Sequence, residues 1–407
     1  MAGGCLPSIS AWQRSAVRIE LVFPKFKLLS GAERLILSLA RALGERGERV
    51  SILCHQLDPS CRPLADGVTI RETGARLEWS GNHYLDSLGA YLLGARLRRA
   101  IAADADVVCL FGPALTVVAL PRRSASAKIL YFCYEPPRAA AQDRDDVLGR
   151  VGGWRWLLAP ALRGYRRVDH WLVDRVDGVL VNGEFGRDRV LAEYAKPSTV
   201  ITHGVRLEPI EESRDDARNA LGIDASARVA ITVNFLHPRK RVDLLLRSWR
   251  EVERRSLQAM LLVVGEGPEG EALRSLARRL DLRRVRFAGF VPEADLPRYY
   301  RCADLLCHVA REETFGFTIL EAGEFELPVV CVDEGGPRYT VRDGETGLRV
   351  EADEAALAGA IASLLGDSAR AQEMGRRGRE WVRGRFTWER GAEDFLTACA
   401  AAGVAAR

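Results

Sequence analysis

The sequence has no cysteine pattern of the kind that disulfide scaffolds or zinc sites require. Its nine cysteines are an odd number scattered along the chain, and no two are spaced as C-x-x-C. Neither a disulfide framework nor a zinc cluster is therefore indicated. Cys109 and Cys331 lie inside the apolar runs VVCLF and VVCVD, where a free thiol packs as a small hydrophobic group. This cysteine usage favours a reducing cytoplasm.

Long apolar segments are missing as well. The first sixteen residues lack the apolar core of a signal peptide, and no stretch of about 18 uninterrupted apolar residues occurs. We therefore expect a cytoplasmic protein, for which any contact with a membrane would be peripheral.

The chain has little excess charge and lacks several catalytic motifs. Its 59 basic and 55 acidic residues leave a net charge of +4 over 407 residues, too little to indicate a nucleic-acid partner. No G-x-S-x-G occurs, and the six histidines form no H-E-x-x-H. Asp104 and Asp106 imitate a metal-binding D-x-D motif, but they precede the buried run VVCLF and are interpreted as part of a structural loop.

The segments that are present alternate between strands and helices in two series. The length predicts two domains. Buried-strand runs in the first series are VRIELVF, RVSILC, DVVCLF, KILYFC and DGVLVN; those in the second are VAITVNF, AMLLVVG, RVRFAGF, ADLLCHV and LPVVCVD. We predict an α/β fold with two doubly wound Rossmann-like domains, residues 1–205 and 206–386, that face each other across a ligand cleft. A final helix within 387–407 is expected to pack back on the first domain.

The most informative stretch runs from Glu313 to Glu321 and reads ETFGFTILE. It resembles a loop that enters a helix, in which Gly316 permits close backbone approach and the free N–H groups from about Phe317 point at an anion. Eight residues place the glutamates about 12 Å apart at helical rise. That separation suits one carboxylate at each end of an extended ligand. The alternative is that Glu313 caps the helix and Glu321 lies on a solvated face.

Two further turns could bind an anion. The string NFLHPRKR ends with Arg239, Lys240 and Arg241 after the first strand of the second domain, where cations can neutralise a diphosphate leaving group; a solvated basic turn is the alternative. In the first domain, Gly31 opens a helix after a strand, but its turn fits neither a dinucleotide fingerprint nor a P-loop.

Taken in order, these segments resemble the family-four retaining glycosyltransferases of the GT-B fold, from about Val17 to the C-terminal helix. SGAERLILSLARAL is similar to the family's first turn and helix, and DRVDGVLVNGEFGRDRV with TVITHGV to the end of its first domain. The second domain is matched by NFLHPRKRVDLL, VVGEGP, FAGFVPEADLPRYYRCADLL, EETFGFTILEAGEFELPVV and DEGGPRYTVRDGETGLRV.

The resemblance implies roles for residues of the second domain. Glu313 would bind hydroxyls of the donor sugar, Glu321 the ribose, and Val291 and its neighbours the base. Lys240 would hold the diphosphate with help from Gly31 and the backbone at Gly316 and Phe317.

The chain departs from the family pattern at two positions. The family's usual Arg, five residues before the Lys, is here Phe235, so Arg239 or Arg241 is a candidate for the missing charge. In YFCYEPPRA a family His near the reacting sugar is replaced by Tyr134, which either positions the acceptor or leaves part of the role to Glu135 and Arg138.

The implied function is hexosyl transfer with retention, without a metal or other cofactor. Similarity to α-mannosyltransferases that act on lipid-linked oligosaccharides makes mannose from GDP-mannose the first donor prediction, with a glycan, a lipid-linked molecule or a small molecule as acceptor. A nucleotide-sugar epimerase and a non-catalytic nucleotide-sugar-binding or scaffold protein are the alternatives.

Residues 152–167 combine Trp, Tyr and Leu with Arg and contain no acidic residue. Such a segment could lie on anionic lipid as a peripheral membrane contact. The alternative is an amphipathic packing helix beside the acceptor site, since Pro160 and Gly164 interrupt the helical pattern.

Overall fold

The computed structural model describes residues 16–404, apart from 27–30, 66, 76–92, 122–125, 137–154, 206, 208 and 257. The chain forms two compact units. One contains the described residues up to Leu180, 196–199 and those from Ala392 onward; the other contains 181–195 and 200–391. Against the predicted division at residue 205, residues 181–195 and 200–205 group with the second unit.

A seven-stranded sheet forms the core of the first unit, in the order β5-β3-β1-β6-β7-β8-β9. The pairs from β5 to β7 are parallel, and β6 is buried at every residue, as expected for a strand covered on both faces. The strands are β1 (Arg18–Val22), β3 (Arg49–Cys54), β5 (Thr69–Glu72), β6 (Val107–Phe111), β7 (Lys128–Cys133), β8 (Gly178–Val181) and β9 (Thr199–Val200), with a separate pair β2 (Lys25–Phe26) and β4 (Gln56–Leu57).

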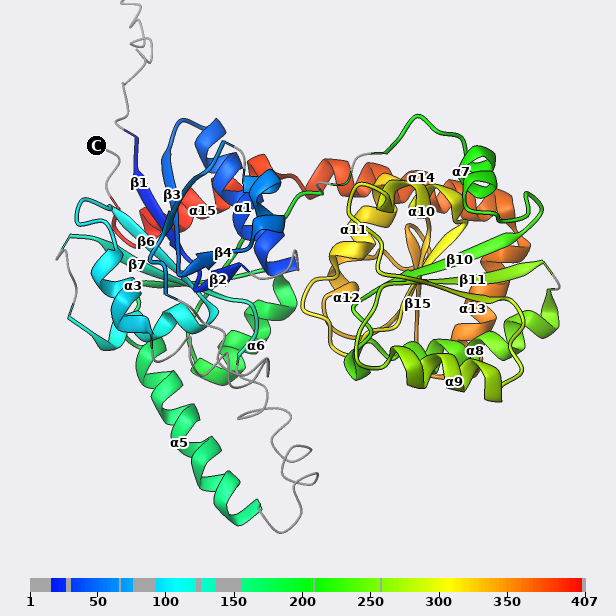
Figure 1. Ribbon diagram of the computed structural model, residues 1–407, viewed down its shortest axis with the longest axis horizontal. Helices are drawn as coiled ribbons and strands as arrows, with labels where there is room; N and C mark the ends of the chain where they lie inside the picture. Colours follow the sequence, from blue (N-terminus) through cyan, green and yellow to red (C-terminus); the bar gives the residue numbers. More distant parts are fainter. Residues whose placement is uncertain are drawn as a thin grey trace, which may run out of the picture. The chain divides into compact units, whose positions relative to one another are not determined.

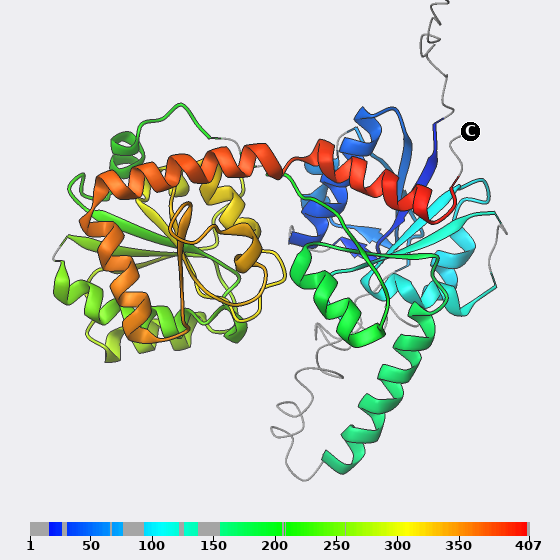
Figure 2. The same cartoon turned by 180° about the vertical axis from the view of Figure 1, so that it is seen from behind.

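Helices of this unit pack through apolar stripes at helical spacing. Leu35, Leu39 and Leu43 of α1 are buried, as expected for apolar residues spaced four apart on one helix face. The helical segments are α1 (Gly31–Glu45), η1 (Pro59–Ala65), α3 (Gly94–Ala100), η2 (Gly112–Ala119) and α5 (Arg155–Val173). Figures 1 and 2 both show α5 projecting away from the sheet of its unit.

The C-terminal half of α15 (Trp388–Ala401) packs on the first unit. A Cβ added at Gly403, just after this helix, would lie 3.5 Å from Nζ of Lys128 in β7. The last helix was expected to pack back on this domain, and its residues from Ala392 group with the first unit.

The second unit is built on a six-stranded sheet in which every pair is parallel, in the order β12-β11-β10-β13-β14-β15. Its strands are β10 (Arg228–Val233), β11 (Ala259–Val264), β12 (Val285–Gly289), β13 (Leu305–His308), β14 (Val329–Val332) and β15 (Gly347–Val350). The order reverses direction between β10 and β13. In such sheets ligands bind outside the carboxyl ends of the strands at the point of reversal.

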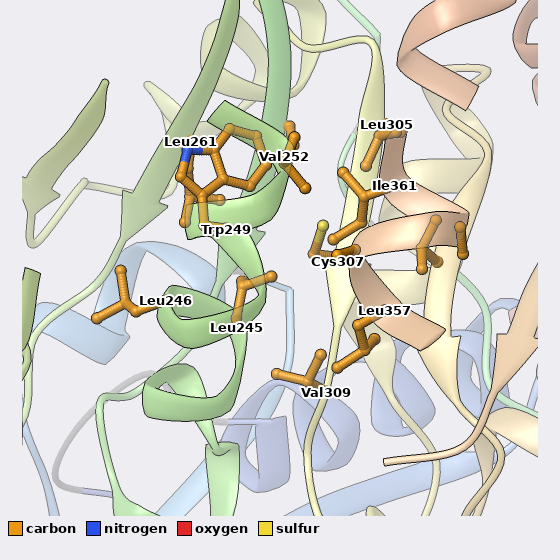
Figure 3. Close-up of a cluster of buried hydrophobic side chains, with 14 of the residues drawn as sticks. Leu245, Leu246, Trp249, Val252, Leu261, Leu305, Cys307, Val309, Leu357 and Ile361 are labelled. Atoms are coloured by element: carbon orange, nitrogen blue, oxygen red, sulfur yellow. The ribbon is translucent and has the colours of Figure 1, made fainter. Parts of the chain in front are cut away.

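Helices cover both faces of this sheet (Figure 1). On one face Leu245, Trp249 and Val252 of α8 pack against Leu357 and Ile361 of α13 over the strands (Figure 3). Side chains of α10 and α11 cover the other face. The helical segments are α6 (Glu184–Tyr194), α7 (Arg214–Ala220), η5 (Pro238–Lys240), α8 (Val242–Arg255), α9 (Gly270–Arg279), α10 (Leu296–Cys302), α11 (Phe317–Glu324), α12 (Pro337–Thr340), α13 (Glu354–Gly366) and α14 (Ser368–Arg385).

No helix in the described part of the chain is long and apolar enough to cross a membrane. Asp104 and Asp106 both contact the guanidinium of Arg18, at 3.1 and 3.3 Å. This pairing is that of a structural loop at the amino ends of the inner strands β1 and β6, in line with the interpretation from the sequence.

Candidate functional site

The loops that follow β10 and β13 bring two predicted site residues together. Lys240 ends η5 after β10, and Glu313 lies in the loop between β13 and α11; Nζ of Lys240 forms an ion pair and hydrogen bond with Oε2 of Glu313. These residues are 73 positions apart in the sequence, and they meet because β10 and β13 are neighbours in a parallel sheet. Two residues that the sequence offered as separate candidates thus meet at the point where strand order reverses.

Glu313 is held in its ionised form. Burial alone would raise the pKa of its carboxyl, but the charges of Lys240 and Arg239 and the Lys240 hydrogen bond outweigh that effect, so the pKa lies below its ordinary value. The side chains of Lys240 and Glu313 keep 27% and 22% of their surface exposed. Both charges therefore remain accessible to a ligand.

Two glycines fix the backbone of the loop that carries Glu313. A Cβ added at Gly335 would lie 2.5 Å from the carbonyl oxygen of Glu313, and Gly335 has a φ of +64°. The N–H of Gly336 donates to that same carbonyl oxygen at 2.6 Å. The chain after β14 thus supports the Glu313 loop by backbone contact, which leaves no room for side chains at these two positions.

Gly316 ends the loop and begins α11. Its φ is +85° and it is the N-cap of the helix, a conformation that favours glycine. The N–H groups of the first turn of a helix have no partner within the helix, so those from Phe317 are placed to bind an anion. The role of the Gly316 and Phe317 backbone in binding a diphosphate stays a prediction.

Glu321 lies inside α11 and is buried. Its Oε2 accepts a hydrogen bond from the hydroxyl of Tyr300 at 2.5 Å, and Tyr300 is fully buried on α10. The alternative in which Glu321 lies on a solvated helix face is wrong. Its contact with a ribose remains a prediction. The hydrogen bond from Tyr300 holds one of its two carboxylate oxygens in place.

The two arginines beside Lys240 have different surroundings. Nη2 of Arg239 donates to the carbonyl oxygen of Glu312 at 3.4 Å, while Nη1 of Arg241 pairs with Oε1 of Glu334 at 3.0 Å. Phe235, where the family has an arginine, is 62% exposed. Arg239 is oriented toward the Glu313 loop, whereas Arg241 is committed to another carboxylate.

The turn after β11 lies against the β10 loop. Gly265 and Gly267 belong to a run with G-x-G-x-x-G spacing, GEGPEG, but their role is packing. Cβ atoms there would lie 1.8 and 2.4 Å from the carbonyl oxygens of Asn234 and Leu236. Val291, predicted to lie near the base, is buried just after β12.

Gly31 and Tyr134 belong to the first unit. Gly31 is the first residue of α1. The ring of Tyr134 packs 5.2 Å from that of Phe132, and its hydroxyl is buried without a hydrogen-bond partner among the described residues. Burial, the charge of Glu33 and Cys109 raise the pKa of Tyr134 well above its ordinary value, so it is a phenol and not a base. Arg138 lies outside the described residues.

Sequence reasoning missed two polar groups of this region, His308 and Tyr300. His308 interrupts the apolar run LLCHV at the carboxyl end of β13, and that interruption was the available signal. A cavity of about 110 Å³ is lined by Thr314 and Phe315, which directly follow Glu313 in the chain, and by Arg385 among others. Groups of three or more metal-binding side chains do not occur among the described residues.

Comparison with known proteins identifies the family. The family model "Glycosyl transferase 4-like domain" matches residues 30–204, and "Glycosyl transferases group 1" matches residues 213–381. The GDP-mannose-dependent alpha-(1-6)-phosphatidylinositol monomannoside mannosyltransferases of Mycolicibacterium smegmatis and Mycobacterium tuberculosis H37Rv are 32% identical over 260 residues and 31% over 280. These matches cover 60% and 64% of this chain, and 66% and 71% of those proteins.

A solved structure shows the same architecture. The Anabaena protein Alr3699/HepE, determined in complex with UDP and glucose, superposes with a TM-score of 0.73 at 18% identity and covers 94% of this chain and 99% of that one. Since two glycosyltransferase models match the two halves of the chain and a relative above 30% identity is covered over 71% of its length, the chain belongs to the family-four glycosyltransferases of the GT-B fold.

Proposed function

We propose that this glycosyltransferase moves a hexose, mannose from GDP-mannose in the first instance, to a glycan, lipid-linked or small-molecule acceptor with retention of configuration. The observation that carries the proposal is the Lys240–Glu313 pair at the reversal point of the second sheet. The names of the two mycobacterial relatives, which specify GDP-mannose and a phosphatidylinositol acceptor, support this donor and favour a lipid-linked acceptor.

The pair explains how one corner could handle both parts of a nucleotide sugar. Lys240 would screen the diphosphate as its charge grows in the transition state, together with the first-turn N–H groups of α11. The ionised carboxylate of Glu313 would accept hydrogen bonds from sugar hydroxyls. In a retaining transfer of this kind, the leaving diphosphate oxygen takes the proton of the acceptor hydroxyl while the new glycosidic bond forms on the same face of the sugar.

Tyr134 would serve the acceptor side in the first unit, whereas Gly31 would assist in binding the donor. Tyr134 stays protonated, so it would orient the acceptor as a hydrogen-bonding phenol and would not remove its proton. This assignment keeps proton transfer with the leaving group. Gly31 and the backbone of α1 would contribute further N–H groups to the diphosphate.

A thermal-shift panel of GDP-, UDP-, ADP- and dTDP-sugars tests the donor. GDP-mannose should raise the unfolding midpoint most, because a ligand at 100 times its Kd stabilises the folded state by about 2.7 kcal/mol. Lys196→Ala, which breaks an ion pair with Asp174 in the first unit, is the matched control for Lys240→Ala; only the latter should abolish the shift. If a different nucleotide sugar gives the largest stabilisation, that sugar would replace GDP-mannose as the proposed donor. If no nucleotide sugar stabilises the protein, the proposal is rejected.

Turnover separates transfer from the alternatives. With donor and acceptor present, a transferase forms a new glycoside. An epimerase converts the donor without an acceptor, and a binding protein, the reading suggested by Phe235 and Tyr134, gives a thermal shift but no product.

We further propose that α5 contacts an anionic membrane surface. It is one continuous helix that includes Pro160, and residues 163–168 are all exposed. Three of these six are arginines, and Tyr165, Val168 and Trp171 are exposed apolar side chains of the same helix. Of the predicted segment 152–167, residues 152–154 lie outside the described part.

Liposome co-sedimentation tests this contact. Changing Arg163, Arg166 and Arg167 to Gln should weaken binding to anionic vesicles by roughly 100-fold, at about 1 kcal/mol per arginine. A matched control makes the same charge change at Arg278, Arg279 and Arg283, which are exposed in the second unit, and it should bind as wild type does. Equal sedimentation of both triple variants would leave α5 as a packing helix.

A further inference from the structure

A buried histidine lies beneath the loop that carries Glu313. His308 is the last residue of β13, and its side chain is 2% exposed. Nδ1 of the ring is 3.3 Å from Oγ1 of Thr318 in the first turn of α11. Nε2 has no hydrogen-bond partner in the described part of the chain. Polar atoms buried in native proteins nearly always have a partner, so this nitrogen calls for an explanation.

The free nitrogen points at the expected anion site. A Cβ added at Gly316 would lie 3.6 Å from Nε2 of His308, which places the nitrogen beside the N-cap of α11. The same Cβ would lie 3.0 Å from Cδ1 of Ile319, so the glycine keeps the space next to the ring clear. The charges of Glu313 and Lys240 both act on His308. Thr318, the N-cap of α11, Glu313 and Lys240 therefore all lie near this imidazole ring.

The ring is neutral and can present either a proton or a lone pair. Burial is the main cause that lowers the pKa of His308 to about 4; the Lys240 charge adds to it and the Glu313 charge opposes it. In a neutral imidazole one nitrogen donates and the other accepts. Since the hydroxyl of Thr318 can donate to Nδ1 or accept from it, the proton can sit on Nε2 when an oxygen acceptor is near.

We propose that His308 is a donor-binding residue whose Nε2 forms a hydrogen bond with an oxygen of the sugar–diphosphate end of the nucleotide sugar. The inference rests on the proposed function and adds a contact to that site. A diphosphate that binds Lys240 competes with Glu313 for the same ammonium group. Donor entry therefore rearranges the two side chains whose charges reach the ring, and Nε2 gains the partner that it lacks.

Two substitutions separate the contact from packing. In His308→Gln the amide nitrogen of the side chain can take the place of Nε2, whereas in His308→Asn the shorter amide can replace only Nδ1 and its bond to Thr318. His308→Asn should lower kcat/KM for the donor on the order of 10- to 100-fold, the range for a lost hydrogen bond to a charged group. His308→Gln should stay within a few-fold of wild type, and KM for the acceptor should not change in either.

Binding of the nucleoside diphosphate alone locates the oxygen. If His308→Asn weakens the binding of GDP as much as the binding of GDP-mannose, the partner of Nε2 is a phosphate oxygen. If it weakens only the binding of GDP-mannose, the partner is a sugar oxygen. Both results support the contact. Wild-type kinetics in His308→Asn, or equal losses in both variants, would overturn it. Wild-type protein that binds no nucleotide sugar would overturn the proposed function as well, whereas an active wild type with an unaffected Asn variant overturns the His308 contact alone.

A measurement on the unchanged side chain covers the case in which neither variant folds. In protein labelled with ¹⁵N-histidine, saturation with the donor should move the Nε2 resonance of a neutral histidine. The shift should persist in His237→Gln, which removes the exposed histidine of the β10 loop. Histidine nitrogen resonances that stay unchanged in that variant would overturn the contact.

Discussion

Lys240→Ala should lower kcat on the order of 100- to 1000-fold while the protein stays folded, because removal of one well-placed charge from the transition state of a buried site has effects of that size. Lys240 is the ion-pair partner of Glu313 and stands at the carboxyl end of β10. Steady-state assays with saturating donor and acceptor measure the loss, and the unfolding midpoint checks the fold.

Lys196→Ala provides the matched control for that experiment. Lys196 also forms an ion pair, with Asp174 at 3.1 Å, but it does so in the first unit. Its replacement makes the same chemical change away from the β10 corner and should leave kcat close to wild type. Near-normal turnover of Lys240→Ala would remove this lysine from the site.

Glu313→Gln should reduce kcat/KM on the order of 100-fold, since the amide keeps the shape of the side chain but loses the negative charge that accepts strong hydrogen bonds from sugar hydroxyls. The effect should be largest for the intact nucleotide sugar and small for binding of the nucleoside diphosphate, because Glu313 is assigned to the sugar. Kinetics for the donor and calorimetry with GDP measure the two quantities.

A neutral control distinguishes this loss from a general effect of charge. Glu326 is exposed and pairs with Arg379 at 2.6 Å, so Glu326→Gln makes the same substitution outside the site and should be silent. In the double variant of Lys240 and Glu313, the losses should not add, because the two side chains act on one another. Unchanged kcat/KM in Glu313→Gln would contradict its role.

The sequence predicted the central strands of both sheets because these strands are buried on both faces and read as continuous apolar runs. It did not predict β5, TIRE, whose residues are mostly exposed at the edge of the first sheet, or β15, GLRV, at the edge of the second. Edge strands can be polar because one of their long edges has no neighbouring strand and is open to solvent. The sequences of β5 and β15 therefore lack the signal that identifies buried strands, whereas the edge strand β12 was predicted from the run RVRFAGF.

The site was predictable to the extent that strand order was. Lys240 and Glu313 each follow a buried strand, and a doubly wound sheet places the two strands side by side. The pairing of Arg241 with Glu334 and of Tyr300 with Glu321 depends on side-chain packing between distant segments, which periodicity does not encode. For the same reason the sequence left Arg239 and Arg241 as equal candidates, although the structure gives them different partners.

The glycine-supported loops also decide where this enzyme could be redesigned. Added Cβ atoms at Gly265, Gly267 and Gly335 would fall 1.8 to 2.5 Å from carbonyl oxygens, so a mutant library that varies these positions would consist mainly of misfolded clones. Phe235 and Phe290, by contrast, are 62% and 71% exposed in the loops that follow β10 and β12, so a replacement side chain there can extend into solvent. Diversity aimed at new nucleotide sugars belongs at these two phenylalanines, on a backbone frame that is left intact.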